Sequence, residues 1–300
     1  MRHCLVLLTA IMLAASAAAD DGKPPSSRYT GLSLFADAGA YWGDRNTADF
    51  YSGRPEGANT ILRVLHSNTY GTQIWNHLTE QQLISSAVGS YSQLTVDEYP
   101  SMYYRTSFAY GLGLRYDYSS GVGWLLRFDL ARLNAIGAFN LSTDNHTGIL
   151  SDNARYIRCG MVGREDRINI DFAITANAAI NDAWDIELDL GGGLNNTKVR
   201  ENMMEIAGAT YSILDIWDGQ SPDYGVGQYE YVNQGGLGWN LFVSVLAGYR
   251  MTGVGAVRVG YTIYRTHTVL KGYTANGWNH MLGIRLEINN LKQFNLVNDD

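Results

Sequence analysis

Few residues of the chain could catalyse a hydrolysis. Such a reaction needs a nucleophile, a histidine and an acid within hydrogen-bond reach of one another. His267 is followed directly by Thr268, and His280 is near Trp278. Asp144 and His146 are near neighbours of the kind that a surface protease would use. None of them belongs to a recognised nucleophile signature. The sequence therefore favours a protein without catalytic activity, with a hydrolase of lipid or peptide as the alternative.

Metal, cofactor and nucleic-acid sites are not indicated either. The 6 histidines are scattered and the 2 cysteines form no cluster, whereas zinc sites combine closely spaced Cys and His ligands. The glycine runs at 191–193 and 253–255 are not followed by a helical pattern, so they do not read as phosphate-binding loops. A formal net charge of -7 argues against a nucleic-acid partner, which would require a basic surface. We expect no cofactor, no metal and no nucleic acid.

Charged side chains recur at every second position within apolar segments. Arg127 and Asp129, for example, alternate with Leu126, Phe128 and Leu130. Successive side chains of a β-strand point to opposite faces, so the charged residues share one face and the apolar residues the other. Buried charges of both signs must pair. The parity predicts an interior salt-bridge network of Arg115, Asp117, Arg127, Asp129, Asp185, Glu187, Asp189, Arg258, Arg285 and Glu287, with Asp37, Arg105, Arg167, Asp171 and Arg250 on the same face.

Eight segments carry this period of two, which is a strand pattern and not the 3.6-residue period of a helix. Most segments are longer than ordinary strands and approach the length that a tilted strand needs to cross a bilayer. Charged residues make up only 17% of the chain, which suits strands that face an apolar medium. The alternation alone would also fit a soluble β-sandwich. The segments cover residues 32–42, 104–117, 124–130, 167–177, 184–190, 239–250, 257–264 and 278–288.

The connections between these segments alternate between short and long, which argues against the sandwich. Outer-membrane barrels have short periplasmic turns and long surface loops, and their aromatic residues form belts at both membrane interfaces. Tracing alternate strand directions predicts an outer belt of Trp42, Tyr104, Trp239 and Trp278 and a periplasmic belt of Tyr116, Tyr118, Trp124, Trp184 and Tyr249. The predicted fold is all-β, a transmembrane antiparallel up-and-down β-barrel of eight strands. Its extracellular loops are expected over about 43–102, 136–164, 196–237 and 268–277.

The N-terminal residues have the pattern of a secretory signal over residues 1–19. Arg2 supplies a positive start, an apolar stretch follows, and small residues precede Asp20. With the barrel pattern, this predicts export to the outer membrane of a Gram-negative bacterium. A periplasmic lead-in is expected over 20–28, the barrel over 29–289 and a tail over 290–300. Cleavage would leave Cys159 without a partner for an internal disulfide.

The layout resembles the small OmpA-type barrels of outer membranes. The similarity covers residues 29–289 and consists of the strand pattern, the long outer loops, the short inner turns and the charged interior. The resemblance implies eight strands, whose interior is just wide enough for side chains to fill it. We therefore expect a closed lumen, with a narrow channel as the alternative.

Two of the predicted loops carry residues suited to binding. In the first loop, Asn59 or Thr60 begins a helical segment, and a second helical segment around residues 72–84 presents Trp75. Apolar helices on a surface loop need something to pack on, so this pair either covers the barrel mouth or docks on another protein. The loop over 196–237 places aromatic rings beside carboxylates and amides, which suit sugars or peptides. Its candidate residues are Trp217, Asp218, Tyr224, Tyr229 and Tyr231.

The function expected from the sequence is that of a non-enzymatic outer-membrane barrel. It would present its surface loops for binding, or serve as an accessory subunit of a larger transport or secretion complex. Its expected partners are outer-membrane lipid and, through the first loop, another outer-membrane protein. A hydrolase at the outer rim and a narrow channel are the alternatives.

Overall fold

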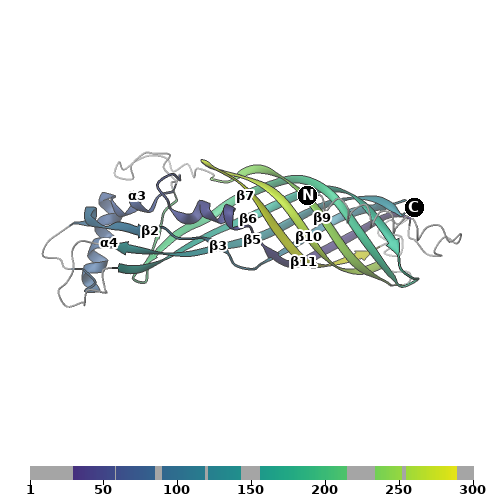
Figure 1. Cartoon of the computed structure of the whole chain (residues 1–300), viewed down its shortest axis with the longest axis horizontal. Helices are drawn as coiled ribbons and strands as arrows, with labels where there is room; N and C mark the ends of the chain where they lie inside the picture. Colours follow the sequence, from purple (N-terminus) through teal and green to yellow (C-terminus); the bar gives the residue numbers. More distant parts are fainter. Residues whose placement is uncertain are drawn as a thin grey trace, which may run out of the picture.

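Eight antiparallel strands close into a ring in the computed structural model, which describes residues 30–57, 59–84, 90–118, 121–142, 156–214, 234–251 and 255–288 (Figure 1). Each strand pairs with its neighbour along the chain, and the ring is completed where β1 pairs with β11. The predicted eight-stranded up-and-down barrel is therefore confirmed. The ring strands are β1 (Gly31–Trp42), β4 (Ser107–Asp117), β5 (Val122–Ser142), β6 (Tyr156–Ala179), β7 (Trp184–Ile206), β9 (Gly236–Met251), β10 (Gly255–Leu270) and β11 (Tyr273–Ile288).

The register around the ring fixes how far the strands are staggered. Ala36 of β1 pairs directly with Leu286 of β11. In the other direction around the ring, the series of paired residues starts at Leu112 on β4 and reaches His267 on β10. It returns to β11 at Asn276, which is ten residues from Leu286. A stagger of this kind requires strands that are tilted to the barrel axis, and eight strands leave an interior that side chains can fill.

The outer wall of the ring is apolar. Leu112 is 67% exposed, Phe108 is 61% exposed and Ile174 is 60% exposed, and each belongs to the parity that the sequence assigns to lipid. Only a closed barrel or a helix can satisfy its backbone hydrogen bonds while facing hydrocarbon. We call this wall the lipid belt. Among the residues described by the structure, no helix combines the length and the hydropathy needed to cross a membrane.

One member of the predicted aromatic belts lies elsewhere. Tyr104 is buried inside the barrel, with its side chain 9% exposed, and does not belong to the outer belt. It forms the short strand β3 (Tyr103–Tyr104), which ends before β4 begins. The register changes by one residue between them: Tyr104 pairs with Ala135, whereas Ala109 pairs with Ala131. The alternation is thus reset between β3 and β4, which turns Tyr104 inward.

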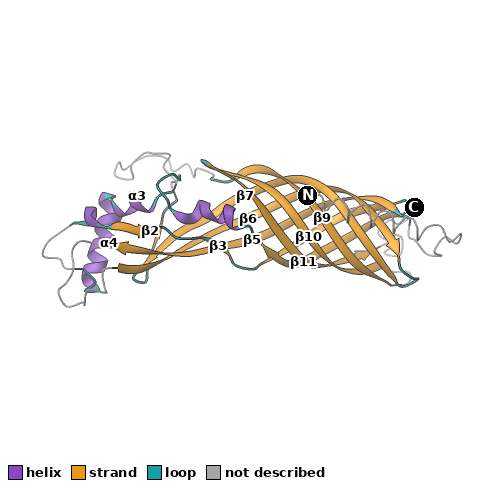
Figure 2. Ribbon diagram, viewed as in Figure 1, coloured by secondary structure: helices purple, strands orange, loops and turns teal. Residues whose placement is uncertain are grey.

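Strands β5, β6 and β7 continue far beyond the lipid belt, at the end of the barrel opposite the short turns (Figure 2). They have 21, 24 and 23 residues, against 12 in β1 and 11 in β4. Residues 136–142, 156–164 and 196–206 therefore belong to strands and not to the loops expected there. Similarly, β10 and β11 are joined at Lys271 and Gly272, so most of the loop expected over 268–277 is strand.

The helices of the first connection pack on these extended strands. We call this part of the molecule the head. Strand β2 (Thr95–Glu98) pairs with β5, and β8 (Ala209–Ser212) pairs with β7. Thr60 caps α3 and Ser67 caps α4 by accepting hydrogen bonds from backbone N–H groups of the first turn. The head consists of the parts of β5–β7 beyond the lipid belt, β2, β8 and the segments α2 (Arg45–Ala48), η1 (Asp49–Ser52), α3 (Ile61–Leu65), α4 (Asn68–Glu80) and η2 (Tyr91–Gln93).

The interior of the head is filled with apolar side chains. On the extended strands, the face that points into the lumen lower down now carries Leu133, Phe139 and Met161, all at most 2% exposed. Ile74 and Leu78 of α4 are also fully buried and belong to the same cluster. The helices of the first connection therefore bury their apolar side against the extended strands, which holds them in place.

Candidate functional site

Glu187 is the centre of an ionic cluster in the half of the lumen near the short turns. Its Oε1 lies 2.6 Å from Nη1 of Arg285, and its Oε2 lies 2.9 Å from Nε of Arg258. Arg115 also binds it through Nη1. The side chains of Glu187 and Arg115 are fully buried. One carboxylate thus holds together three arginines from β4, β10 and β11.

The remaining acids of this cluster surround the same arginines. Asp117 lies 2.7 Å from Arg115, Asp189 lies 3.1 Å from Arg285, and Asp185 lies 3.3 Å from Arg258. Glu287 binds Arg258. The structure therefore brings eight of the ten predicted network residues into this one cluster.

The other two, Arg127 and Asp129, belong to a second cluster at mid-height. Arg127 lies 2.8 Å from Asp129 and 2.9 Å from Asp171. Its guanidinium stacks 4.5 Å from the ring centroid of Phe242 and donates to the hydroxyl of Tyr264 at 3.0 Å. This arginine therefore combines ion pairs with cation–π contacts in a buried site.

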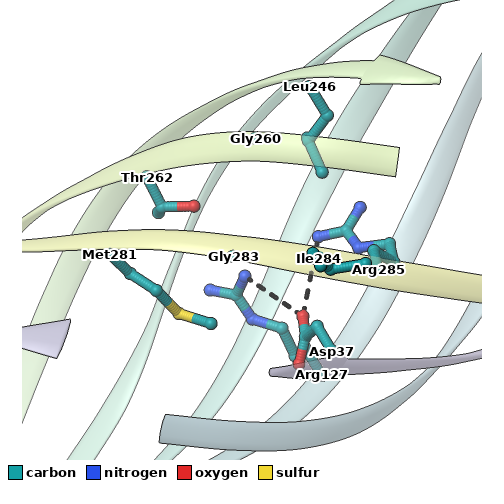
Figure 3. Close-up of a pocket in the computed structure, with 9 residues that line it drawn as sticks. All are labelled: Asp37, Arg127, Leu246, Gly260, Thr262, Met281, Gly283, Ile284 and Arg285. Carbon is teal, nitrogen blue, oxygen red and sulfur yellow. Dashed lines mark ion pairs between the residues drawn. The ribbon is translucent and has the colours of Figure 1, made fainter. Parts of the chain in front are cut away.

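Asp37 links the two clusters. Its Oδ2 lies 3.9 Å from Arg127 and 3.8 Å from Arg285, so the two guanidinium groups converge on it from β5 and β11 (Figure 3). A cavity of about 20 Å³ lies beside these three residues. This is enough for a single water molecule and too little for a ligand.

A third cluster closes the lumen towards the head. Arg167 lies 2.5 Å from Glu165 and donates to the hydroxyl of Thr47 at 2.9 Å. Tyr51, on η1 of the first connection, donates to Glu165 at 2.7 Å. Burial raises the pKa of Tyr51 well above its ordinary value, so its hydroxyl stays protonated and available as a donor. Gly163 makes room for the Tyr51 ring, because any Cβ there would collide with it.

Sequence reasoning missed Glu165, although the signal was present. Glu165 has the same parity as Arg167 and follows from the same alternation along β6. Of the other charged positions on this parity, Asp37, Arg167, Asp171 and Arg250 face inward, and Arg250 lies 2.8 Å from Asp185. Arg105 was expected inward and is exposed. The register change next to Tyr104 explains this difference.

The three clusters fill the lumen with buried side chains at three heights. Arg115, Arg127 and Arg167 are among the largest fully buried side chains, and each is held by carboxylates. Separating the partners of such a buried ion pair costs free energy, so these side chains stay in place in the lumen.

We expect the full-length protein to give no stable single-channel current in a planar lipid bilayer. The side chains of Arg115, Arg127 and Arg167 block the lumen at three heights. A porin of about 16 strands, whose lumen is an aqueous channel, serves as the control for insertion. Large and reproducible conductance steps from the folded protein would show that the lumen is open and would favour the narrow-channel alternative.

Of the residues predicted to bind a partner, the structure describes only Trp75. Trp75 lies on α4 with 9% of its surface exposed, and it belongs to the same buried cluster as Ile74 and Leu78. It is a core residue and cannot serve as a contact for a partner. Trp217, Asp218, Tyr224, Tyr229 and Tyr231 lie outside the described residues.

The face of α4 that does face outward is polar and carries no charge over two turns. Its exposed side chains provide hydroxyl, amide and phenol groups, which both donate and accept hydrogen bonds. They belong to Asn68, Thr69, Tyr70, Thr72, Gln73 and Asn76. We call this surface the α4 face.

Strand geometry separates His267 from Thr268, two of the candidate hydrolytic residues. His267 faces outward, stacked at 5.6 Å on Trp239, with its Nδ1 3.0 Å from Oδ1 of Asn276. Thr268 is fully buried on the opposite face of β10. Nδ1 of His280 lies 2.8 Å from the hydroxyl of Tyr261. Asp144 and His146 lie outside the described residues. Within the described part of the chain, neither His267 nor His280 is hydrogen-bonded to the serine, threonine or carboxylate that an acyl-transfer site requires.

Metal chemistry finds no support in the part of the chain that the structure describes, where no three His, Cys, Asp or Glu side chains are grouped to hold an ion. Cys159 is buried in the head, and its Sγ lies 3.4 Å from the carbonyl oxygen of Ile157.

Comparison with known proteins returns small outer-membrane barrels. The sequence matches no protein-family model and no curated protein. Among solved structures, Neisserial surface protein A is similar over 87% of this chain and 97% of its own, with 10% identity and a TM-score of 0.41. Ail, the attachment invasion locus protein of Yersinia pestis, was solved with the heparin analogue sucrose octasulfate. It is similar over 86% of this chain and 99% of its own, with 11% identity and a TM-score of 0.34. The outer membrane protein OprG of Pseudomonas aeruginosa is similar over 87% and 98%, with 10% identity and a TM-score of 0.37. The fold itself rests on the closed ring of eight strands described above.

Proposed function

We propose that this chain is a non-enzymatic outer-membrane barrel that holds the head outside the cell, where the head binds another molecule. The bound molecule is either a free ligand or a neighbouring protein, for which the chain acts as an accessory subunit of a larger outer-membrane complex. The filled lumen supports a role in anchoring and not in transport through the barrel itself.

The extension of β5–β7 is the observation that carries this proposal. Along these strands the inward-facing residues change from charged, as at Asp171 and Arg167, to apolar, as at Met161. A barrel that only spanned the membrane would have no need of a second core beyond it. The extended strands and the buried side of α4 instead hold a folded surface at a fixed distance from the lipid belt.

The α4 face is the part of the head best suited to contact a partner. This face carries hydroxyl, amide and tyrosine groups, which are typical of recognition surfaces that bind through hydrogen bonds. The aromatic Tyr70 is 37% exposed and offers the largest apolar area on this face. A surface of this kind favours a polar partner, such as a sugar or a hydrophilic protein surface, over a hydrophobic one.

Photo-crosslinking in intact cells tests the proposal. A photoreactive amino acid at Gln73 or Asn76, both exposed on α4, is expected to give one adduct of the same mass from both positions. The matched control is Thr274, which is exposed at the same end of the barrel on β11. Adducts that are equally abundant from Thr274, or none from the α4 positions in correctly assembled protein, would contradict binding through this face.

A further inference from the structure

Four cations stand on the outer wall of β5–β7 at the edge of the lipid belt. On β5, Leu130 is the last apolar side chain of the belt and Arg132 the next one on the same face. Ile168 on β6 pairs with Asn196 on β7. The next pair on the same face, in the direction of the head, is Asp166 with Lys198. The four cations are Arg132, Arg164, Lys198 and Arg200, which we call the cationic band.

Asp166 organises two of these cations. Its Oδ1 lies 3.1 Å from Nε of Arg132, and its Oδ2 lies 2.5 Å from Nη2 of Arg200. The Asp166 side chain is only 7% exposed, whereas those of Arg132 and Arg200 are 70% and 49% exposed. The carboxylate is thus covered, and the two guanidinium groups that cover it keep donors directed to the outside.

A bulge in β7 places the cations side by side. The register between β6 and β7 shifts at Arg164 and Glu165, which pair with Glu201 and Val199. Arg200 is therefore an extra residue on β7, and it lies next to Lys198 on the outer wall. Bulges commonly redirect a side chain in this way. Arg164 forms an exposed pair with Glu201 at 3.1 Å.

We propose that the cationic band binds phosphate groups of the glycolipid in the outer leaflet. In the described part of the chain, the four cations form ion pairs with two carboxylates, Asp166 and Glu201, so the band keeps a positive surplus that a phosphate can neutralise. The planar guanidinium matches phosphate oxygens with two parallel hydrogen bonds. The position supports a lipid as the source of the phosphate, because headgroups lie where the lipid belt ends.

Internal ion pairing explains this arrangement less well. Exposed ion pairs contribute little to stability, and one arginine would be enough to neutralise Asp166. Two arginines and a neighbouring lysine around one covered carboxylate leave a positive surplus, which a further anion would neutralise. The band lies on the barrel wall and does not depend on what the α4 face binds.

The test measures lipid binding by the full-length barrel in detergent. Added phosphorylated lipid A is expected to raise the midpoint of thermal unfolding of the wild type, and chemically dephosphorylated lipid A is not. The triple variant with Arg132→Gln, Lys198→Gln and Arg200→Gln should lose this effect, with a fall in affinity of about tenfold for each cation removed. Arg158→Gln is the matched control, because Arg158 is exposed on the same face of β6, farther from the membrane.

Asp166→Asn separates phosphate binding from a structural ion pair. Removing this carboxylate frees two guanidinium groups, so the affinity for phosphorylated lipid A should stay the same or rise. A loss of binding in Asp166→Asn, or equal protection by dephosphorylated lipid A, would overturn the proposal. Equal protection by inorganic phosphate at the same concentration would show a simple anion site and would also overturn a lipid assignment.

Discussion

Replacing Arg127 with methionine is expected to lower the free energy of unfolding of the barrel by about 3–5 kcal/mol, the cost of leaving buried charges without their partner. Methionine keeps much of the volume of the side chain and removes its charge. Asp129 and Asp171, which lie 2.8 Å and 2.9 Å from Arg127, would then face each other with no cation in direct contact. The variant also loses the stacking of the guanidinium on Phe242.

Urea unfolding of the protein in lipid vesicles, followed by tryptophan fluorescence, measures this loss. Arg164→Met is the matched control, because Arg164 also pairs with a carboxylate but its side chain is 51% exposed. The control should change stability by no more than about 1 kcal/mol. Equal effects of the two substitutions would show that the buried cluster adds nothing beyond an exposed pair.

A second substitution distinguishes charge from packing. Asp129→Asn in the Arg127→Met background removes one of the two abandoned carboxylates. If unpaired charge is the cause, the double variant should recover part of the lost stability, and the two effects should not add. If the effects of the two substitutions simply add, the loss comes from packing.

The lumen could be predicted from the sequence because one rule governs it. Wherever a strand is regular, every second side chain faces inward, so Arg115 and Glu187 were placed correctly although they are 72 residues apart. The rule fails where the strand is interrupted. Between Tyr104 and Ala109 the register shifts by one residue, and this shift reverses the expected positions of Tyr104 and Arg105.

The head could not be predicted in the same way, because the outward side chains of its strands are polar and the inward ones are apolar. Beyond Leu130 the outward positions carry Arg132 and Asn134, and the inward positions carry Leu133 and Ala135. The strand continues, yet its polar and apolar faces are exchanged as it leaves the lipid. A search for outward apolar residues therefore ends the strand too early.

Trp75 illustrates the consequence for the candidate site. An apolar helix on a surface loop suggests a docking face when the surface that it covers is unknown. That surface is formed by strands far along the chain, including Phe139 and Met204 in the same core. The sequence gives the amphipathic helix, and only the three-dimensional arrangement shows which side is already occupied.

Leu78→Ala is expected to unfold the head while leaving the barrel intact. Leu78 is fully buried in the head core, and truncating such a residue costs about 2–5 kcal/mol. A loss of 2 kcal/mol raises the population of the opened head about thirtyfold, and proteolysis follows this population when opening is fast. Cleavage within the first connection should therefore accelerate by at least about thirtyfold.

Limited proteolysis of the protein in lipid vesicles measures this rate, and resistance to heat in detergent reports on the barrel. Gln73→Ala is the matched control, because Gln73 is exposed on the same helix. Its cleavage rate should match that of the wild type. The head is packed by apolar side chains and the lumen mainly by ion pairs, so the heat resistance of Leu78→Ala should also match the wild type. A parallel loss of heat resistance would mean that the two cores fold as one unit, and that the head cannot be altered independently of its anchor.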